Sequence, residues 1–173
     1  VIISNGIETK SFSKDDRQKQ REAFRFEHEI PFDAHFIGTL GELKELKGQR
    51  DFVLAAKITA EKFPQAYFAI IGKDNSSNQS FRRELKRLVK IFGLNDRFIW
   101  LNWVEDTANF LSALDVYVSP SHSESFGLAT LEAMADQTPI VATETTGTKE
   151  LLQNYESGLL VPINDSVSLA ESI

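Results

Sequence analysis

The chain has 173 residues, 42% of them hydrophobic, no cysteine and a formal net charge of -6 at pH 7. This length and apolar content support one sizeable core, so we expect residues 1–173 to form a single domain. The acidic balance without a dense basic run argues against nucleic-acid binding, the lack of cysteine excludes disulfides and thiolate metal sites, and no apolar run approaches the roughly 20 residues of a membrane span.

Short apolar segments alternate with helix-compatible segments along the chain. The first strand is expected over residues 1–7, and the charged segment that follows is typical of a surface helix that stops at Pro31. Further strands are expected at 34–40, 66–72, 97–101, 115–119, 139–142 and 158–161, and helices at 49–63, 80–93, 106–114, 126–136, 148–153 and from residue 166. This alternation predicts an α/β fold, a Rossmann-like doubly wound parallel sheet with helices on both faces.

The stretch S-E-S-F-G-L-A-T-L-E-A-M-A (123–135) follows a short buried strand and runs into a helix. A loop in that position lies at the carboxyl edge of the sheet, where the free N–H groups of a helix's first turn can bind an anion. Glu124 stays in the loop, and Glu132 lies about 8 to 9 Å along the helix from Phe126. The two carboxylates are therefore placed to contact groups on either side of a bound anion. On spacing alone, an equally open alternative makes Glu124 a loop acid or helix cap and Glu132 a solvated helix residue.

The longer run S-P-S-H-S-E-S-F-G-L-A-T-L-E-A-M-A-D-Q-T-P-I-V-A (119–142) resembles the signature of retaining GT-B glycosyltransferases of the glycosyl transferases group 1 family. V-I-I-S-N-G-I resembles the entry into that family's C-terminal domain, L-K-G-Q-R-D-F-V-L-A-A its first helix, and T-G-T-K-E-L-L-Q-N-Y-E-S-G-L-L-V-P its closing strand. The resemblance implies the nucleotide-sugar (donor) half of a larger two-domain enzyme, without the N-terminal acceptor domain. We expect a cytoplasmic protein whose membrane contact, if any, belongs to the missing part.

The resemblance also implies roles for individual residues. Glu132 would accept hydrogen bonds from the ribose hydroxyls of the nucleotide, and Glu124 from hydroxyls of the transferred sugar near its anomeric carbon. Between them, the diphosphate would bind at the helix N-terminus, where a glycine permits close backbone approach. The implied substrate-binding residues of this turn are Ser125, Phe126, Gly127 and Leu128.

Lys47, which is followed by a glycine, resembles the lysine that neutralises the departing diphosphate in this family, an electrostatic role. The family pattern places an arginine after the glycine of the preceding strand, with a short loop to the lysine. Here Thr39 takes the arginine's place and the loop is longer. One of two cationic contacts to the diphosphate is then missing, and Lys44 competes for the remaining role.

Other polar residues carry weaker signals. His122 could reach a donor hydroxyl, but a loop histidine satisfied by the protein is the simpler interpretation. Asp115 is interpreted as structural and Asp74 as part of a surface turn, while Trp103 and Val104 could line a base pocket through backbone groups. No His, Asp and Glu cluster has metal-ligand spacing, and the G-x-G-x-x-G fingerprint is absent, so neither a metal nor another cofactor is expected.

The sequence therefore predicts the donor-binding domain of a metal-independent glycosyltransferase that transfers a sugar from a nucleotide-diphospho-sugar to an acceptor hydroxyl. The isolated chain is expected to be inactive, because the acceptor half is missing. An alternative is a degenerate Rossmann-like module that binds a nucleotide or a protein without transfer, which Thr39 motivates. A sugar phosphorylase or epimerase would need a pyridoxal-phosphate lysine or an epimerase signature, neither of which is identifiable.

Overall fold

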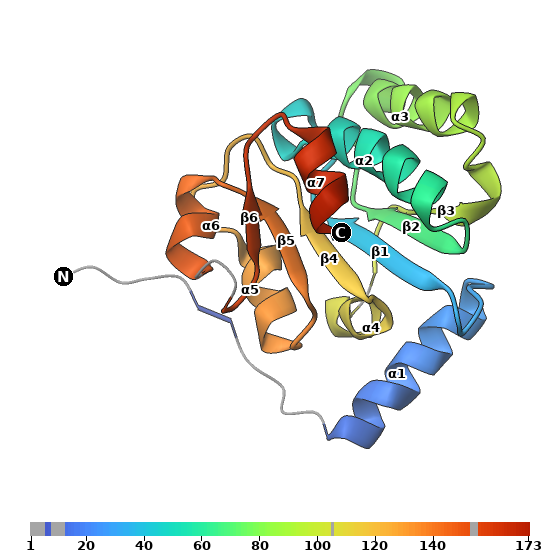
Figure 1. Cartoon of the computed structure of the whole chain (residues 1–173), viewed down its shortest axis with the longest axis vertical. Coiled ribbons are helices and arrows are strands. Elements are labelled where there is room, and N and C mark those ends of the chain that lie inside the picture. Colours follow the sequence, from blue (N-terminus) through green and yellow to red (C-terminus); the bar gives the residue numbers. More distant parts are fainter. Residues whose placement is uncertain (1–5, 8–12, 105, 153–155) are drawn as a thin grey trace.

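The computed structural model describes residues 6–7, 13–104, 106–152 and 156–173 (Figure 1). Its strands are β1 His35–Leu40, β2 Ala66–Ile71, β3 Phe98–Leu101, β4 Val116–Ser119, β5 Ile140–Thr143 and β6 Leu159–Val161. Its α-helices are α1 Lys14–Glu27, α2 Gln49–Lys62, α3 Ser80–Ile91, α4 Thr107–Ala113, α5 Leu128–Ala135, α6 Thr146–Leu151 and α7 Ser166–Ser172. Short 3₁₀ turns are η1 Glu45–Lys47, η2 Ser77–Gln79 and η3 Asn95–Arg97. The strand expected over 1–7 lies for the most part outside the described residues.

The strands form one parallel sheet in the order β3-β2-β1-β4-β5-β6. The chain builds from β1 outward through β2 to β3, then returns to place β4 beside β1 and builds toward the opposite edge through β6. The strand order therefore reverses between β1 and β4, where Ile37 is in register with Val116. In open α/β sheets, ligands bind in the crevice beyond the carboxyl ends of the strands at such a reversal. The doubly wound fold predicted from the sequence is confirmed.

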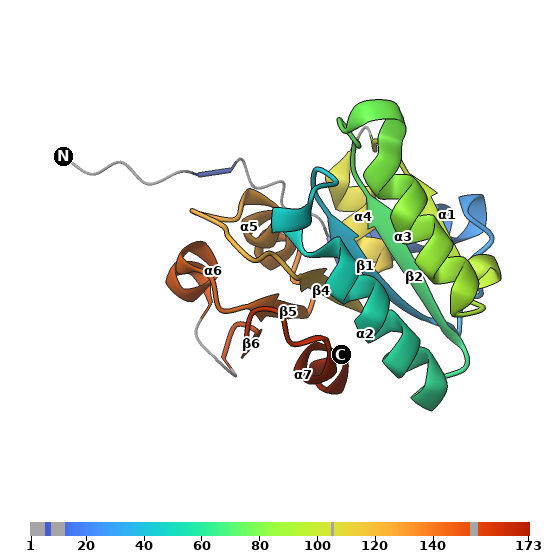
Figure 2. The same ribbon diagram turned by 90° about the horizontal axis from the view of Figure 1, so that it is seen from above.

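Helices cover both faces of the sheet (Figures 1 and 2). One core is shared by α2, α3 and α7, and the other by α1, α4 and α5. Side chains alternate between them, so that Ile37 of β1 joins the first core and its neighbour Phe36 the second. Within the described residues, no helix combines the length and apolar character needed to cross a bilayer.

Two helices at the carboxyl edge begin at residues other than those expected. The helix predicted from Phe126 starts at Leu128, because Gly127 is its N-cap in the left-handed region with φ 94°. The helix predicted from residue 148 starts two residues earlier, because Thr145 and Thr148 form a capping box at its first turn. Both differences shift the position of the first-turn N–H groups that lack a partner within the helix.

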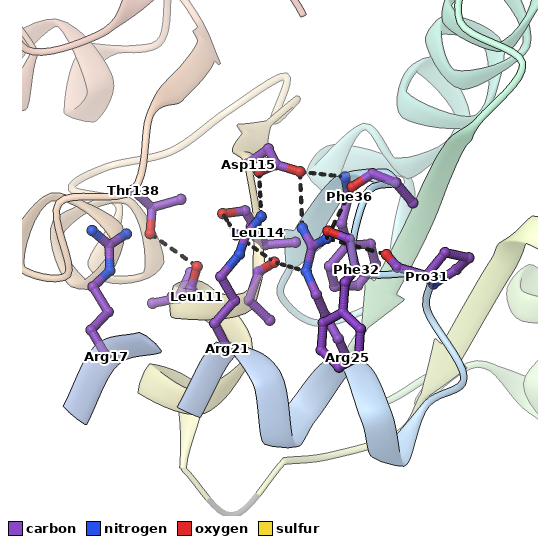
Figure 3. A network of polar contacts seen from close by, with 12 residues as sticks. Arg17, Arg21, Arg25, Pro31, Phe32, Phe36, Leu111, Leu114, Asp115 and Thr138 are labelled. Atoms are coloured by element: carbon purple, nitrogen blue, oxygen red, sulfur yellow. Dashed lines mark hydrogen bonds and ion pairs between the residues drawn. The ribbon is translucent and has the colours of Figure 1, made fainter. Parts of the chain in front are cut away.

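The charged helix α1 is not only a surface helix, and that prediction is wrong for its inner face. Arg25 is fully buried (0% exposed) between α1 and the start of β1 (Figure 3). Its guanidinium donates to the carbonyl oxygens of Ala113 at 3.0 Å and Ala34 at 2.9 Å, and to the Asp115 carboxylate at 2.9 Å. The sequence of α1 does not indicate that Arg25 is buried, because an arginine in a highly charged amphipathic helix is expected to be exposed to solvent.

Asp115 has the structural role expected for it. Its carboxylate accepts from Arg21 at 2.6 Å, from Arg25, and from the Phe36 backbone N–H at 2.7 Å. Burial alone would raise its pKa, but the Phe36 N–H and the two arginines outweigh that effect and hold the pKa of Asp115 below its usual value. The Asp115 carboxylate thereby joins helix α1 to β1 and β4, the two strands at which the strand order reverses.

Asp115 should therefore contribute to the acid sensitivity of the fold. A carboxyl whose folded-state pKa is lowered stabilises the protein above its unfolded pKa, and this contribution is lost as the pH falls through the folded value. We expect the stability difference between the wild type and Asp115→Asn to be largest at neutral pH and to shrink as the pH falls below about 4. Urea unfolding of both proteins across this range measures it, and a constant difference would contradict the assignment.

Candidate functional site

A cavity of about 400 Å³ opens at the carboxyl ends of β1 and β4. It is lined by the loop after β1, the first residue of α2, the loop after β4 and the first turn of α5. This is the crevice that the strand order predicts as the ligand site.

Lys47 and Glu124 meet in this cavity although 77 residues separate them in the chain. The Lys47 ammonium donates to the Glu124 carboxylate, and both side chains are largely withdrawn from solvent, at 27% and 18% exposed. The residues to which the resemblance gives roles at the diphosphate and at the transferred sugar are thus direct partners. Glu124 thus neutralises the charge of Lys47.

The loops that carry these residues are fixed to one another at several points. Gly48 has φ 65°, and a Cβ added to it would lie 1.8 Å from the carbonyl oxygen of Pro120. The His122 N–H donates to the Leu46 carbonyl at 2.9 Å, and the His122 ring binds the Asp51 carboxylate at 2.5 Å. His122 is therefore a loop histidine satisfied by the protein, and it holds the start of α2 against the loop after β4.

The first turn of α5 points unused N–H donors at the cavity. No side chain caps this helix, and its first internal hydrogen bond runs from the Leu131 N–H to the Gly127 carbonyl at 3.0 Å. Leu128 and the two residues after it line the cavity, and their N–H groups have no partner within the helix. Gly127 is needed here for its left-handed φ, since an added Cβ would meet only ordinary contacts at 3.5 Å.

Helix α6 contacts the loop after β4 through Gly147, a residue for which the sequence predicted no role. The Gly147 N–H donates to the Glu124 carbonyl at 2.9 Å, and a Cβ on Gly147 would lie 2.6 Å from the backbone of Phe126. Only a glycine lets α6 touch the backbone of residues 124–126. No signal pointed to this role, because Gly147 lies directly before the helix predicted at 148–153, where a glycine is common.

Buried hydroxyl groups form the floor of the cavity. Thr39, Ser119, Ser121 and Tyr117 all line it and are almost fully buried. Burial raises the pKa of the Tyr117 phenol well above its usual value, so this group stays neutral, with hydrogen bonds to Thr130 and Ser119. Thr39, the residue in the expected arginine position, brings a hydroxyl and no charge.

Glu132 lies apart from the cavity lining. It sits half-buried on α5, where the Thr107 hydroxyl at the start of α4 donates to its carboxylate. Burial raises the pKa of Glu132, the nearby Asp106 charge adds to the rise, and the Thr107 hydrogen bond opposes it. The structure therefore brings together Lys47, Glu124 and residues 125–128, while Glu132 has a separate environment toward α4.

The remaining candidates divide between structure and cavity. Lys44 lines the cavity and its ammonium binds Glu42 at 2.7 Å. Asp74 is buried rather than part of a surface turn, because its carboxylate accepts backbone N–H groups at 2.8 and 2.7 Å. Trp103 is 78% exposed and Val104 packs on the second core, and neither lines the cavity. Within the part of the chain that the structure describes, no group of three or more His, Cys, Asp or Glu is arranged to hold a metal ion.

Residues 20–173 match the model of the family described as "Glycosyl transferases group 1". The lipopolysaccharide core biosynthesis mannosyltransferase LpcC of Rhizobium leguminosarum bv. viciae is 32% identical over 139 residues, which cover 80% of this chain and 40% of that protein. A D-inositol 3-phosphate glycosyltransferase of Corynebacterium jeikeium is 31% identical over 99% of this chain and 42% of its own length. The chain therefore spans about two fifths of the length of these curated relatives.

Solved structures agree with this match. The C-terminal domain of a glycosyl transferase group 1 family protein (LpcC) from Francisella tularensis superimposes with a TM-score of 0.79 at 31% identity, over 92% of this chain and 81% of that one. HepE from Anabaena, in complex with UDP-glucose, superimposes with a TM-score of 0.80 at 25% identity, over 88% of this chain and 41% of that one.

Proposed function

The chain belongs to the glycosyl transferases group 1 family, and we propose that it is the donor-binding domain of a retaining, metal-independent transferase that uses a nucleotide-diphospho-sugar. The observation that carries this proposal is the cavity between β1 and β4, where the Lys47–Glu124 pair faces the uncapped first turn of α5. A cation and free N–H donors in one crevice suit a diphosphate. The complex of HepE with UDP-glucose, a protein of the same fold, supports a nucleotide sugar as the ligand.

The two glutamates then serve the two sugars of the donor. Glu124 lines the cavity beside Lys47, so its carboxylate is placed to accept from hydroxyls of the transferred sugar. Glu132 lies outside the cavity lining, toward α4, and in this scheme the ribose extends from the diphosphate to that side. In this scheme Glu132 contacts the nucleotide and not the transferred sugar.

Catalysis in this scheme is electrostatic. When the bond between the anomeric carbon and the diphosphate oxygen breaks, the leaving group gains negative charge, which Lys47 and the first-turn N–H groups of α5 stabilise. The acceptor hydroxyl attacks the anomeric carbon from a second domain, which we place in the part of the enzyme outside this chain, and its proton passes to the departing diphosphate. Lys47 must release Glu124 at least in part when the diphosphate binds, and Glu124 is then free to hold the sugar.

Thermal shift with UDP, GDP and ADP and their glucose conjugates, each with and without EDTA, tests the function. A ligand at about 100 times its dissociation constant adds roughly 2.7 kcal/mol of stability. We expect one base to stabilise the chain, equally well in the presence of the chelator. Stabilisation by none of the six ligands would refute donor binding, and stabilisation that EDTA abolishes and Mn²⁺ restores would refute metal independence.

Replacing each glutamate by alanine should separate their roles. Glu132→Ala should weaken the nucleoside diphosphate and the nucleotide sugar alike, each by about 1.5–3 kcal/mol, because a charge-assisted hydrogen bond to the ribose is lost. Glu124→Ala should weaken the nucleotide sugar more than the nucleoside diphosphate, because its partner is the transferred sugar. Calorimetry of both ligands with both variants measures the difference, after circular dichroism shows that each variant is folded.

The control is Glu61→Ala, which removes a carboxylate paired with Lys57 on the surface of α2, outside the cavity lining. It should bind both ligands as the wild type does. If Glu124→Ala and Glu132→Ala lose affinity for the two ligands in the same pattern, the two carboxylates do not bind different sugars. Binding of the nucleotide sugar to the full-length enzyme without any transfer would favour the alternative of a binding module, which the neutral Thr39 on the cavity floor suggests.

A further inference from the structure

The charges that line the cavity cancel. Its ionisable side chains of fixed charge are Lys44, Lys47, Glu42 and Glu124, and each lysine is already paired with one of the glutamates. A diphosphate is a multivalent anion, and a cavity of zero net charge gives it little attraction at a distance. A lysine can therefore contact a phosphate oxygen only by giving up its carboxylate partner at least in part.

Lys44 is placed to make such an exchange beside Lys47. The two lysines stand at the ends of a single 3₁₀ turn, in which the Lys47 N–H donates to the Lys44 carbonyl at 2.9 Å. The Lys44 and Glu42 side chains are 48% and 41% exposed, more than those of the Lys47–Glu124 pair. Exposed ion pairs contribute little free energy. A phosphate can therefore replace Glu42 as the partner of Lys44 more easily than it can replace Glu124 as the partner of Lys47.

The backbone around Lys44 is held in place during such an exchange. Leu43 is buried and its N–H donates to the Lys73 carbonyl at 2.9 Å, which fixes the loop to the end of β2. On the other side, the Gln49 side chain donates to the Glu42 carbonyl at 2.9 Å. The Glu42 carboxylate also accepts from Asn75 at 3.0 Å, so it keeps a partner after Lys44 leaves it.

We propose that Lys44 is a second diphosphate-binding cation and that Glu42 is its exchangeable counter-ion. The inference rests on the proposed function, because it takes the diphosphate of the donor as the ligand. The longer loop after β1 then supplies the positive charge that Thr39 does not. In the free protein, Glu42 keeps Lys44 folded onto the loop, and the entering phosphate displaces it.

Calorimetry with Lys44→Met, Glu42→Gln and the double variant tests the exchange. The probes are whichever of UDP, GDP and ADP binds the wild-type chain, and the matching nucleoside without phosphates. Lys57→Met is the matched control, since Lys57 forms an exposed pair with Glu61 on α2 at 2.9 Å, outside the cavity lining. Glutamine at position 42 retains an acceptor for Asn75, so the loop stays anchored.

The two single variants should act in opposite directions. Lys44→Met should weaken the nucleoside diphosphate about tenfold or more, because a charge-assisted hydrogen bond is lost, and leave the nucleoside unchanged. Glu42→Gln should tighten the diphosphate on the order of threefold, because the competing carboxylate is gone. This gain should vanish in the Lys44→Met background, and Lys57→Met should change the affinity less than about twofold.

Diphosphate affinity of Lys44→Met within about twofold of the wild type would overturn the role of Lys44, as would equal losses for the diphosphate and the nucleoside. A loss of affinity in Glu42→Gln as large as that in Lys44→Met would show that the pair only supports the loop. Failure of this inference is distinct from failure of the proposed function, because in the latter case the wild-type chain itself binds none of the three nucleoside diphosphates.

Discussion

Replacing Arg25 by methionine should lower the free energy of unfolding by about 3–5 kcal/mol. The guanidinium is fully buried and donates to the carbonyls of Ala113, Phe32 and Ala34 as well as to Asp115. Methionine fills a similar volume but removes the donor to the carbonyls of Phe32 and Ala34. It also removes one of the two arginines that pair with Asp115, which keeps Arg21 and the Phe36 N–H. Removing one partner of a buried, hydrogen-bonded pair costs far more than the pair contributes, because the remaining charge stays desolvated.

Urea unfolding at neutral pH measures this loss. The matched control is Arg83→Met on the exposed side of α3, which should change the stability by less than about 0.5 kcal/mol. A loss smaller than about 1 kcal/mol for Arg25→Met would mean that α1 and the start of β1 are held by apolar packing instead.

Gly48→Ala should abolish nucleoside diphosphate binding and lower the free energy of unfolding by about 2–5 kcal/mol. Two effects add. Alanine is strained at φ 65°, and its Cβ would lie 1.8 Å from the Pro120 carbonyl oxygen, which is backbone and cannot turn aside. The start of α2 must therefore separate from the loop after β4, which moves Lys47 away from Glu124.

Gly93→Ala isolates the strain of an alanine in the left-handed backbone conformation. Gly93 has nearly the same φ, 69°, but nothing lies within 4 Å of an added Cβ. It should cost about 1–2 kcal/mol for the left-handed backbone and leave nucleotide affinity unchanged. Thermal unfolding and calorimetry of both variants make the comparison. Equal effects of the two substitutions would show that the contact between Gly48 and Pro120 does not shape the cavity.

The order and type of elements followed from local patterns, because hydrophobic periodicity and helix stop signals act over a few residues. The strand expected at 97–101 and the helix at 80–93 lie within two residues of β3 and α3. Helix starts that depend on one dihedral angle were less predictable: nothing in the sequence says that Gly127 adopts φ 94° and delays α5. Likewise, the burial of Arg25 depends on carbonyl groups supplied by two other segments, the stretch before β1 and the end of α4.

The resemblance placed Lys47 and Glu124 at one ligand, and both lie in the cavity. It could not indicate that they neutralise each other, because ion pairing depends on side-chain positions set by contacts 77 residues apart. It also gave no reason to expect Gly147, whose importance is steric and arises only where α6 meets the backbone of Phe126. A glycine that is required because another backbone segment packs against it cannot be recognised from a single sequence.

The pairing of β1 with β4 also bears on how the protein folds. Ile37 pairs with Val116, and the contact between Arg25 and Asp115 spans 90 residues, so the centre of the sheet is built from distant parts of the chain. Closing so long a loop costs more entropy than pairing β1 with β2, so we expect the β1–β4 contacts to form after those between β1 and β2. The cavity then exists only in molecules whose two halves have already docked, and a bound nucleotide would slow unfolding while leaving the rate of refolding unchanged.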